Sequence, residues 1–231
     1  MSSPLYAITP TLFTQPSPAT FIAATALLGR IVVDATPGAA ASGTSPALYG
    51  GCSVIDFVAT SSDSVARDLV LYKGLIATTQ GAATGAITAT TSTLTRATAG
   101  FIGDGWRVGD LLMAFAPATL APNAAVDGIL AIVTAVTDTV LTVNGTPLAA
   151  LTLAAGTRIC RVSQHYRAPV AIGAGTNSTT ASAGLLNNSL DGSAVKTELK
   201  LGAANMLIAA LPVAVSALPA YLSVAAVVAL Y

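Results

Sequence analysis

The chain reads, from residue 105 to residue 115, Gly105-Trp106-Arg107-Val108-Gly109-Asp110-Leu111-Leu112-Met113-Ala114-Phe115. Glycines bracket the first part, as in a tight turn, and the apolar run after it has the length of a buried β-strand. The chain's only tryptophan lies at the entrance to this strand. The stretch therefore predicts a turn that leads into a buried strand of a β-domain.

The segments on both sides of this stretch continue the strand pattern. After it, residues 128–136 and 139–143 are rich in β-forming residues and are separated by the turn Thr137-Asp138. Before it, Ile87 and Leu94 are widely spaced apolar residues in a tract of Ala, Gly and Thr, which indicates two weak strands. Several short strands joined by turns are typical of a small β-barrel or meander.

The first part of the chain is too rich in proline for a long helix, because proline interrupts helical hydrogen bonding. The prolines lie at positions 4, 10, 16, 18, 37 and 46. We predict an extended arm over residues 1–20 and a short strand over residues 29–34. Residues 52–60 and 66–73 fit two strands with a short turn between them, which predicts a β-hairpin.

The remaining segments also favour strands. Residues 157–162 predict one strand, and residues 168–173 predict an edge strand because Pro169 cannot donate a hydrogen bond to a sheet. No helical period persists beyond two turns anywhere in the chain. The sequence is therefore typical of an all-β protein.

The C-terminal stretch requires a test for membrane insertion. From Leu201 to Tyr231 no residue is charged, and this stretch exceeds the ~20 apolar residues that span a bilayer. Because Pro212 and Pro219 interrupt it, we predict two buried strands and no membrane span. The start of the chain, Met1 to Pro4, has no basic segment before an apolar core, so we expect no secretory signal.

These patterns combine into an all-β fold with three parts. We expect residues 21–79 and 158–231 to form a jelly-roll-like β-sandwich, residues 80–157 to form a small β-barrel inserted into it, and residues 1–20 to form the arm. The Ala, Gly and Thr tract after residue 79 is a tolerable insertion point. A tandem arrangement of separate domains fits the pattern nearly as well.

The composition argues for a structural or assembly protein. The 231 residues include ten acidic and ten basic residues and one histidine, so the formal net charge is zero, and 53% of the residues are hydrophobic. A neutral chain lacks the basic footprint that binds nucleic acid or an anionic membrane. Low charge and high apolar content make an isolated monomer poorly soluble. We therefore expect a chain packed among other subunits, with no nucleic acid or membrane as partner.

The residues that carry chemistry are too few and too scattered for an enzyme. His165 is the sole histidine and has no nucleophile motif near it. Asp104 and Asp110 are expected to close turns. Cys52 and Cys160 are expected to be free, buried thiols, although a bridge between them stays open. We therefore expect no catalytic site, no metal and no cofactor, because one His and two distant Cys cannot supply four zinc ligands.

Two further features have more than one reading. Arg158, Arg161 and Arg167 form the only cationic concentration, which fits either a contact with an acidic patch on a neighbouring subunit or ordinary solvation of a strand. Trp106 fits a core or barrel-rim residue, and a carbohydrate-stacking platform is the alternative.

Two passages together resemble a known class of proteins. Gly105-Trp106-Arg107-Val108-Gly109-Asp110, with the hairpin over residues 132–143, resembles a small β-barrel module common in tailed-phage virion proteins. Residues 52–72 and 199–231 resemble the hairpin and late strands of phage sandwich proteins. The resemblance covers about half of the chain and implies a virion component.

The resemblance implies a non-enzymatic structural protein, first of all a capsid decoration (cement) protein located in the virion and assembled in the host cytoplasm. Its partners would be the major capsid protein or other virion subunits, and other copies of itself, with a trimer favoured. The arm would lie across neighbouring capsid subunits through its apolar anchors, Leu5, Tyr6, Leu12 and Phe13. The alternatives are a tail, neck or baseplate component and, from another class, a receptor-binding or glycan-binding module.

Overall fold

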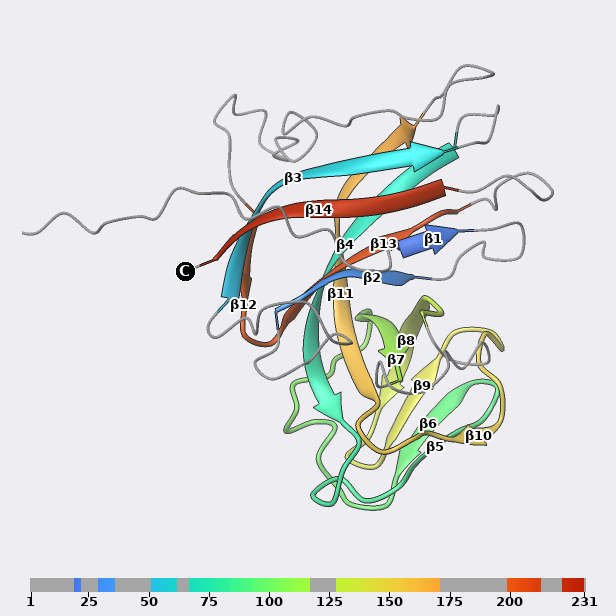
Figure 1. Ribbon diagram of the computed structural model, residues 1–231. Coiled ribbons are helices and arrows are strands. Elements are labelled where there is room, and N and C mark those ends of the chain that lie inside the picture. Colours follow the sequence, from blue (N-terminus) through green and yellow to red (C-terminus); the bar gives the residue numbers. More distant parts are fainter. Residues whose placement is uncertain are drawn as a thin grey trace, which may run out of the picture.

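A computed structural model describes residues 19–21, 29–35, 51–61, 67–116, 128–170, 199–212 and 222–230. Within these ranges the chain forms β-strands and their connections and no helix, which confirms the all-β prediction (Figure 1). No helix of the described part is therefore long and apolar enough to cross a membrane. Almost all of the predicted arm lies outside the described residues.

The strands are numbered in chain order. They are β1 (Ala19–Phe21), β2 (Arg30–Asp34), β3 (Gly51–Ser61), β4 (Arg67–Thr79), β5 (Ile87–Ala89), β6 (Thr93–Arg96), β7 (Leu111–Phe115), β8 (Ala131–Val136), β9 (Val140–Val143), β10 (Leu151–Thr152), β11 (Arg158–Val170), β12 (Leu199–Gly202), β13 (Asn205–Ala210) and β14 (Leu222–Leu230).

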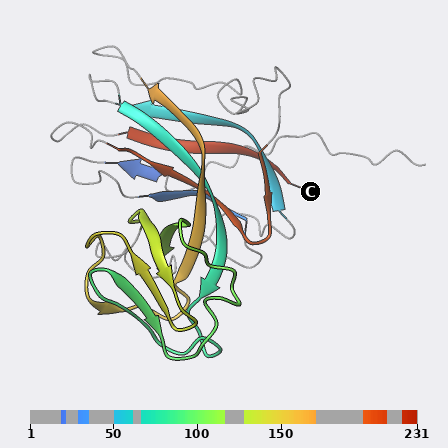
Figure 2. The ribbon, with the colours of Figure 1, turned by 180° about the vertical axis from the view of Figure 1, so that it is seen from behind.

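The strands form two antiparallel sheets. The smaller sheet has the order β1-β14-β3-β12, and the larger has the order β10-β5-β6-β9-β8-β7-β11-β4-β13-β2. In Figures 1 and 2 the smaller sheet lies beside the upper strands of the larger sheet. Strands β5 to β10 form the lower part of the molecule (Figure 1). We call this part, the described residues 80–116 and 128–157, the lower unit.

Two long strands connect the lower unit to the upper strands. β4 and β11 pair with each other from Arg67↔Val170 to Thr79↔Arg158. At its lower end β11 also pairs with β7, and β4 pairs with β13 along its upper part. The lower unit thus lies, in sequence, between two strands that belong to both parts. Its boundaries as an inserted domain, and its closure into a barrel, stay predictions.

The predicted hairpin of residues 52–60 and 66–73 is wrong, although both segments are strands. β3 pairs with β14 and β12, whereas β4 pairs with β11 and β13 in the other sheet. The physical reason is burial: four successive residues of β4, from Leu69 to Tyr72, are buried. A strand with both faces covered takes a central place in its own sheet, and the turn signal after β3 does not specify a partner.

The strand predicted over residues 157–162 and the described part of the strand predicted over residues 168–173, which ends at Val170, belong to one continuous strand, β11. A bulge interrupts its pairing with β4, because Gln164 and Tyr166 pair with successive residues and His165 is skipped. Pro169 lies in the upper half, beyond the residues that pair with β7, where β11 has a described partner strand, β4, on one side only. At the C-terminal end, the two predicted strands are confirmed as β13 and β14. β13 is buried from Met206 to Ala210, and in β14 Val224 and Ala226 are buried.

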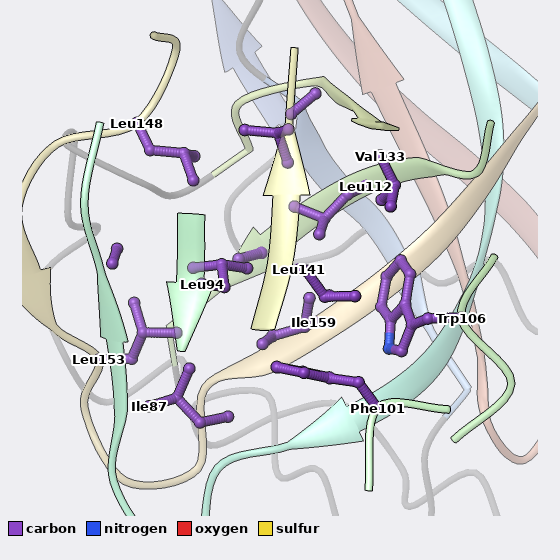
Figure 3. Close-up of a cluster of buried hydrophobic side chains, with 14 residues drawn as sticks. Ile87, Leu94, Phe101, Trp106, Leu112, Val133, Leu141, Leu148, Leu153 and Ile159 are labelled. Carbon is purple, nitrogen blue, oxygen red and sulfur yellow. The ribbon is translucent and has the colours of Figure 1, made fainter. Parts of the chain in front are cut away.

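Two apolar clusters lie on opposite faces of β7 and β11. The lower cluster fills the lower unit (Figure 3) and comprises Ile87, Ala89, Leu94, Phe101, Trp106, Leu112, Ala114, Ala131, Val133, Leu141, Val143, Leu148, Leu153 and Ile159. The junction cluster comprises Val70, Tyr72, Met113, Phe115, Cys160, Val162, Met206, Ile208 and Ala210. Successive residues of β7 and β11 enter different clusters because side chains alternate across a strand. These two strands therefore form a wall shared by both clusters.

A contact between two glycines fastens the segment before β2 to the segment before β8. The amide of Gly29 donates to the carbonyl of Gly128 at 2.6 Å, and the amide of Gly128 donates to Ala114 of β7 at 2.8 Å. A Cβ on Gly128 would lie 2.1 Å from the carbonyl oxygen of Gly29, and Gly128 has φ +71°. Only glycine tolerates both the left-handed backbone and this approach.

Candidate functional site: the loop at residues 100–110

The loop that carries the only tryptophan connects β6 to β7 and is fastened to the β8–β9 hairpin at both ends. The amides of Gly100 and Phe101 donate to the carbonyl of Asp138 at 2.8 and 3.0 Å. At the other end, the amide of Gly109 donates to the carbonyl of Val133 at 2.8 Å. Backbone hydrogen bonds therefore hold the loop against the β8–β9 hairpin at two points.

A buried polar network holds the middle of the loop. Oδ2 of Asp104 accepts a hydrogen bond from Oγ1 of Thr78 at 2.6 Å and one from Nη1 of Arg96 at 2.8 Å. The indole Nε1 of Trp106 donates to Oγ1 of Thr78 at 3.0 Å. Thr78 and Arg96 are buried, so the carboxylate supplies the negative charge that a buried guanidinium needs.

Two arginines add contacts from neighbouring strands. The guanidinium of Arg96, from β6, lies over the ring of Phe101 at 5.1 Å from its centroid, a cation–π contact. Nη1 of Arg161, from β11, donates to the carbonyl of Gly105 at 2.8 Å. With Thr78 of β4, side chains from three strands fix the conformation of this loop.

The outer side of the loop carries exposed apolar side chains. Ile102 is 59% exposed and Val108 is 67% exposed. The large hydrophobic residues exposed in the described part are Leu75, Ile102, Val108 and Ile132, so half of them belong to this loop. Arg107 is exposed beside them. A rigid loop with exposed apolar side chains suits contact with a protein, because little conformational entropy remains to be lost on binding.

Trp106 belongs to the core. It is 3% exposed, and Figure 3 shows its ring pointing into the lower cluster near Phe101, Leu141 and Ile159. Its one polar atom is bonded to Thr78. Trp106 therefore cannot serve as a platform on which a sugar stacks, and the glycan-binding alternative loses the residue on which it rested.

The two aspartates of the loop have different roles. Oδ2 of Asp110 accepts the amide of Arg107 at 2.8 Å, and the amide of Asp110 donates to the carbonyl of Arg107 at 3.2 Å. Asp110 therefore closes a turn, as predicted. For Asp104 that prediction is incomplete, because its carboxylate bonds to side chains from β4 and β6. Residues so distant in sequence give no local signal of this arrangement.

The three predicted arginines do not share one surface. Arg158 forms an ion pair with Asp34 of β2, on the side of the strand that carries Cys160. Arg161 is three residues further along β11, so its side chain points to the opposite face. The side chain of Arg167 lies outside what the structure describes, as do the predicted arm anchors Leu5, Tyr6, Leu12 and Phe13.

The two cysteines are free and buried, which confirms that prediction. Burial raises the pKa of Cys52 to about 11 and the pKa of Cys160 to about 12. Both thiols are therefore protonated and unreactive near neutral pH. Across the described ranges, no group of three or more His, Cys, Asp or Glu side chains is placed to hold a metal ion. The side chain of His165 is not among those described.

No protein-family model, curated protein or solved structure matches this chain. The functional argument therefore rests on the residues of the chain and on their geometry.

Proposed function

We propose that this protein is a non-enzymatic structural component of a tailed-phage particle, first of all a capsid decoration protein that binds the shell. The neutral charge and high apolar content of the chain suit a subunit packed among neighbours. The sequence resemblance to virion β-proteins supplies the class of particle.

The two segments that resemble the small β-barrel module lie side by side in the structure, which supports the proposal further. The turn Gly105–Asp110 and the hairpin over residues 132–143 are separated by a strand and a long connection in sequence. In space the amide of Val133 donates to the carbonyl of Asp110 at 2.9 Å, and Gly109 donates back to Val133 at 2.8 Å. The part of the resemblance that concerns a small β-barrel module thus falls on one compact unit.

The observation that carries the proposal is the fixed loop with exposed Ile102 and Val108. Burying each of these side chains against a neighbouring subunit contributes roughly 1.5–3 kcal/mol before ordering costs. The polar network already holds the loop, so the ordering cost is small. Repetition of the contact around a symmetric shell turns modest affinity into firm retention. The arm anchors Leu5, Tyr6, Leu12 and Phe13 would add a second contact, and trimer formation would multiply both.

Gold-labelled antibody against this chain, applied to intact purified particles, tests the class and the location. Regular labelling over the head is the expected result. Labelling confined to the tail, neck or baseplate would replace decoration by the second candidate. Particles that lack the chain when their dissociated subunits are probed would overturn the virion proposal.

A pair of variants tests the loop. The double substitution Ile102→Asp and Val108→Asp is expected to abolish binding of the purified chain to shells, while its unfolding temperature stays unchanged because both side chains are exposed. Ala150→Asp, at another exposed position of the lower unit, is the matched control and should bind normally. Full binding by the double variant would remove the loop from the contact. Deletion of residues 1–20 tests the arm in the same assay.

A further inference from the structure

The turn after β9 contains the only Asn-Gly pair of the chain, Asn144-Gly145. Both residues are exposed. The backbone amide of Asn144 donates to the carbonyl of Ile132 at 2.8 Å, which anchors the start of the turn. Within the described part of the chain, no hydrogen bond holds the side-chain amide of Asn144 or the N–H of Gly145. The electrophile and the nucleophile of an intramolecular reaction therefore lie next to each other and unrestrained.

We propose that Asn144 is a site of spontaneous deamidation through a cyclic imide. The backbone nitrogen of Gly145 would attack Cγ of Asn144. Gly145 has φ +66°, and a Cβ built on it meets no atom within 4 Å, so open space lies beside its α-carbon. The glycine also has no side chain of its own to oppose ring closure.

The reaction is balanced without any oxidant or cofactor. The N–Cγ bond forms, the bond from Cγ to the side-chain nitrogen breaks, and ammonia leaves with the proton from Gly145. Water then opens the imide at one of its two carbonyl groups. Opening at one carbonyl yields aspartate, and opening at the other yields isoaspartate, in which the main chain passes through the side-chain carbon.

Two other sites in the described part serve as internal comparisons. Asn205 is held, because its Oδ1 accepts the amide of Gly202 at 2.9 Å and its Nδ2 donates to Gly74 at 3.4 Å. Asp104 also precedes a glycine, but its carboxylate is bonded to Thr78 and Arg96, and the amide of Gly105 donates to Ile102 at 3.0 Å. The structure thus restrains these two sites and leaves Asn144 unrestrained.

The modification would change both charge and local structure. Either product adds one negative charge to a chain whose formal net charge is zero. Isoaspartate also lengthens the main chain directly after Val143, whose side chain is buried and whose amide donates to Ser92 at 2.8 Å. We therefore expect the isoaspartate form to loosen the end of β9.

The test is to incubate the full folded chain in heavy-oxygen water at neutral and mildly alkaline pH and to map its peptides by mass spectrometry. We expect oxygen uptake at position 144 to be roughly tenfold or more faster than at Asn205. The rate should rise with hydroxide concentration, because attack requires the deprotonated amide of Gly145. An isoaspartate-specific methyltransferase should label the incubated wild-type chain.

Two variants and one reference state complete the test. Asn144→Gln should remove the signal, because the larger ring forms much more slowly, and Gly145→Ala should slow it, with unfolding temperature checked for both. The same incubation in denaturant gives the rate in the absence of structure. Equal rates at Asn144 and Asn205 in the folded chain, or a site at 144 that reacts only after unfolding, would overturn the proposal.

Discussion

The strands that border only the lower cluster and the strands that border the junction cluster bury their side chains differently. β5, β6 and β9 alternate between buried and less buried positions, as strands with one covered face do. β13 is buried at five successive positions, from Met206 to Ala210. β7 is likewise buried from Leu112 to Phe115. The one-sided strands β5, β6 and β9 therefore border the lower cluster alone, whereas β7 and β13, which supply residues to the junction cluster, are covered on both faces.

The difference implies that the two parts depend on one another for stability. β7 and β11 supply residues to both clusters. Unfolding of the lower unit, which would release these two strands, would therefore also expose the junction cluster. A unit bounded only by its own one-sided strands would be able to unfold by itself. The following predictions, from the largest expected effect to the smallest, test this dependence.

Substitution at the contact between Gly29 and Gly128 should give the largest loss of stability. Gly128→Ala places a Cβ 2.1 Å from the carbonyl oxygen of Gly29 and imposes a left-handed backbone on alanine. We expect the free energy of unfolding to fall by roughly 3–5 kcal/mol, measured by urea denaturation, or the soluble yield to collapse.

Gly109→Ala is its matched control. Gly109 also has a positive φ, +93°, but a Cβ built there meets nothing within 4 Å. This variant should lose only the backbone term, about 1 kcal/mol. Equal losses in the two variants would mean that the close approach of Gly29 and Gly128 contributes nothing.

Cavities in the two clusters should lower one and the same unfolding transition. Leu141→Ala, in the lower cluster, and Ile208→Ala, in the junction cluster, each remove a fully buried side chain and should cost about 3 kcal/mol. Fluorescence of Trp106 reports on the lower cluster, and far-ultraviolet circular dichroism reports on all strands. The two signals should shift together in both variants. A fluorescence midpoint that moves alone in Leu141→Ala would indicate an independent domain.

The polar network of the loop should contribute less to the free energy of unfolding than the two apolar clusters do. Asp104→Ala leaves the buried guanidinium of Arg96 without its carboxylate, and we expect a loss of about 2 kcal/mol because Asp104 is partly solvated. Hydrogen exchange at Gly105 and Trp106 should accelerate. Asp138→Ala removes an exposed carboxylate nearby and should change stability by less than about 0.5 kcal/mol. Unchanged exchange in Asp104→Ala would show that the network does not hold the loop.

The buried thiols should give the smallest effect. Their pKa values in the folded chain, about 11 for Cys52 and about 12 for Cys160, lie above the unfolded value of 9.0. The unfolded state therefore loses protons first, and stability falls as the pH rises through 9. The loss at that pH is about 0.4 kcal/mol for each thiol.

Urea denaturation over this pH range checks the sign. The pH dependence should become shallower in Cys52→Ala and shallower again in the variant that also carries Cys160→Ala. In the wild-type chain neither thiol should react with a thiol reagent at neutral pH until the chain unfolds. Rapid labelling of the folded chain would contradict the burial on which this prediction rests.

The sequence predicts the turns and the strand of the candidate loop, but it does not predict the side-chain hydrogen bonds that hold the loop in place. The glycine-flanked turn, the strand after it and the turn role of Asp110 follow from local residue types, because turn geometry restricts which residues fit. The bonds from Thr78 and Arg96 to Asp104 join β4 and β6 to the loop, and no local pattern specifies such distant partners. Arg158 and Arg161 looked like one group because proximity in sequence ignores the alternation of faces along a strand.

The sequence by itself determined where most described strands lie and that the described chain is all-β. Alternating or continuous apolar runs favour a buried β-strand, and this signal is local because it does not depend on which strand becomes the partner. Tertiary structure decided which strands pair, so that β3 and β4 entered different sheets instead of one hairpin. It also decided that Trp106 is buried while Ile102 and Val108 are exposed. Pairing and exposure depend on how distant faces cover one another, and that information is spread over the whole chain.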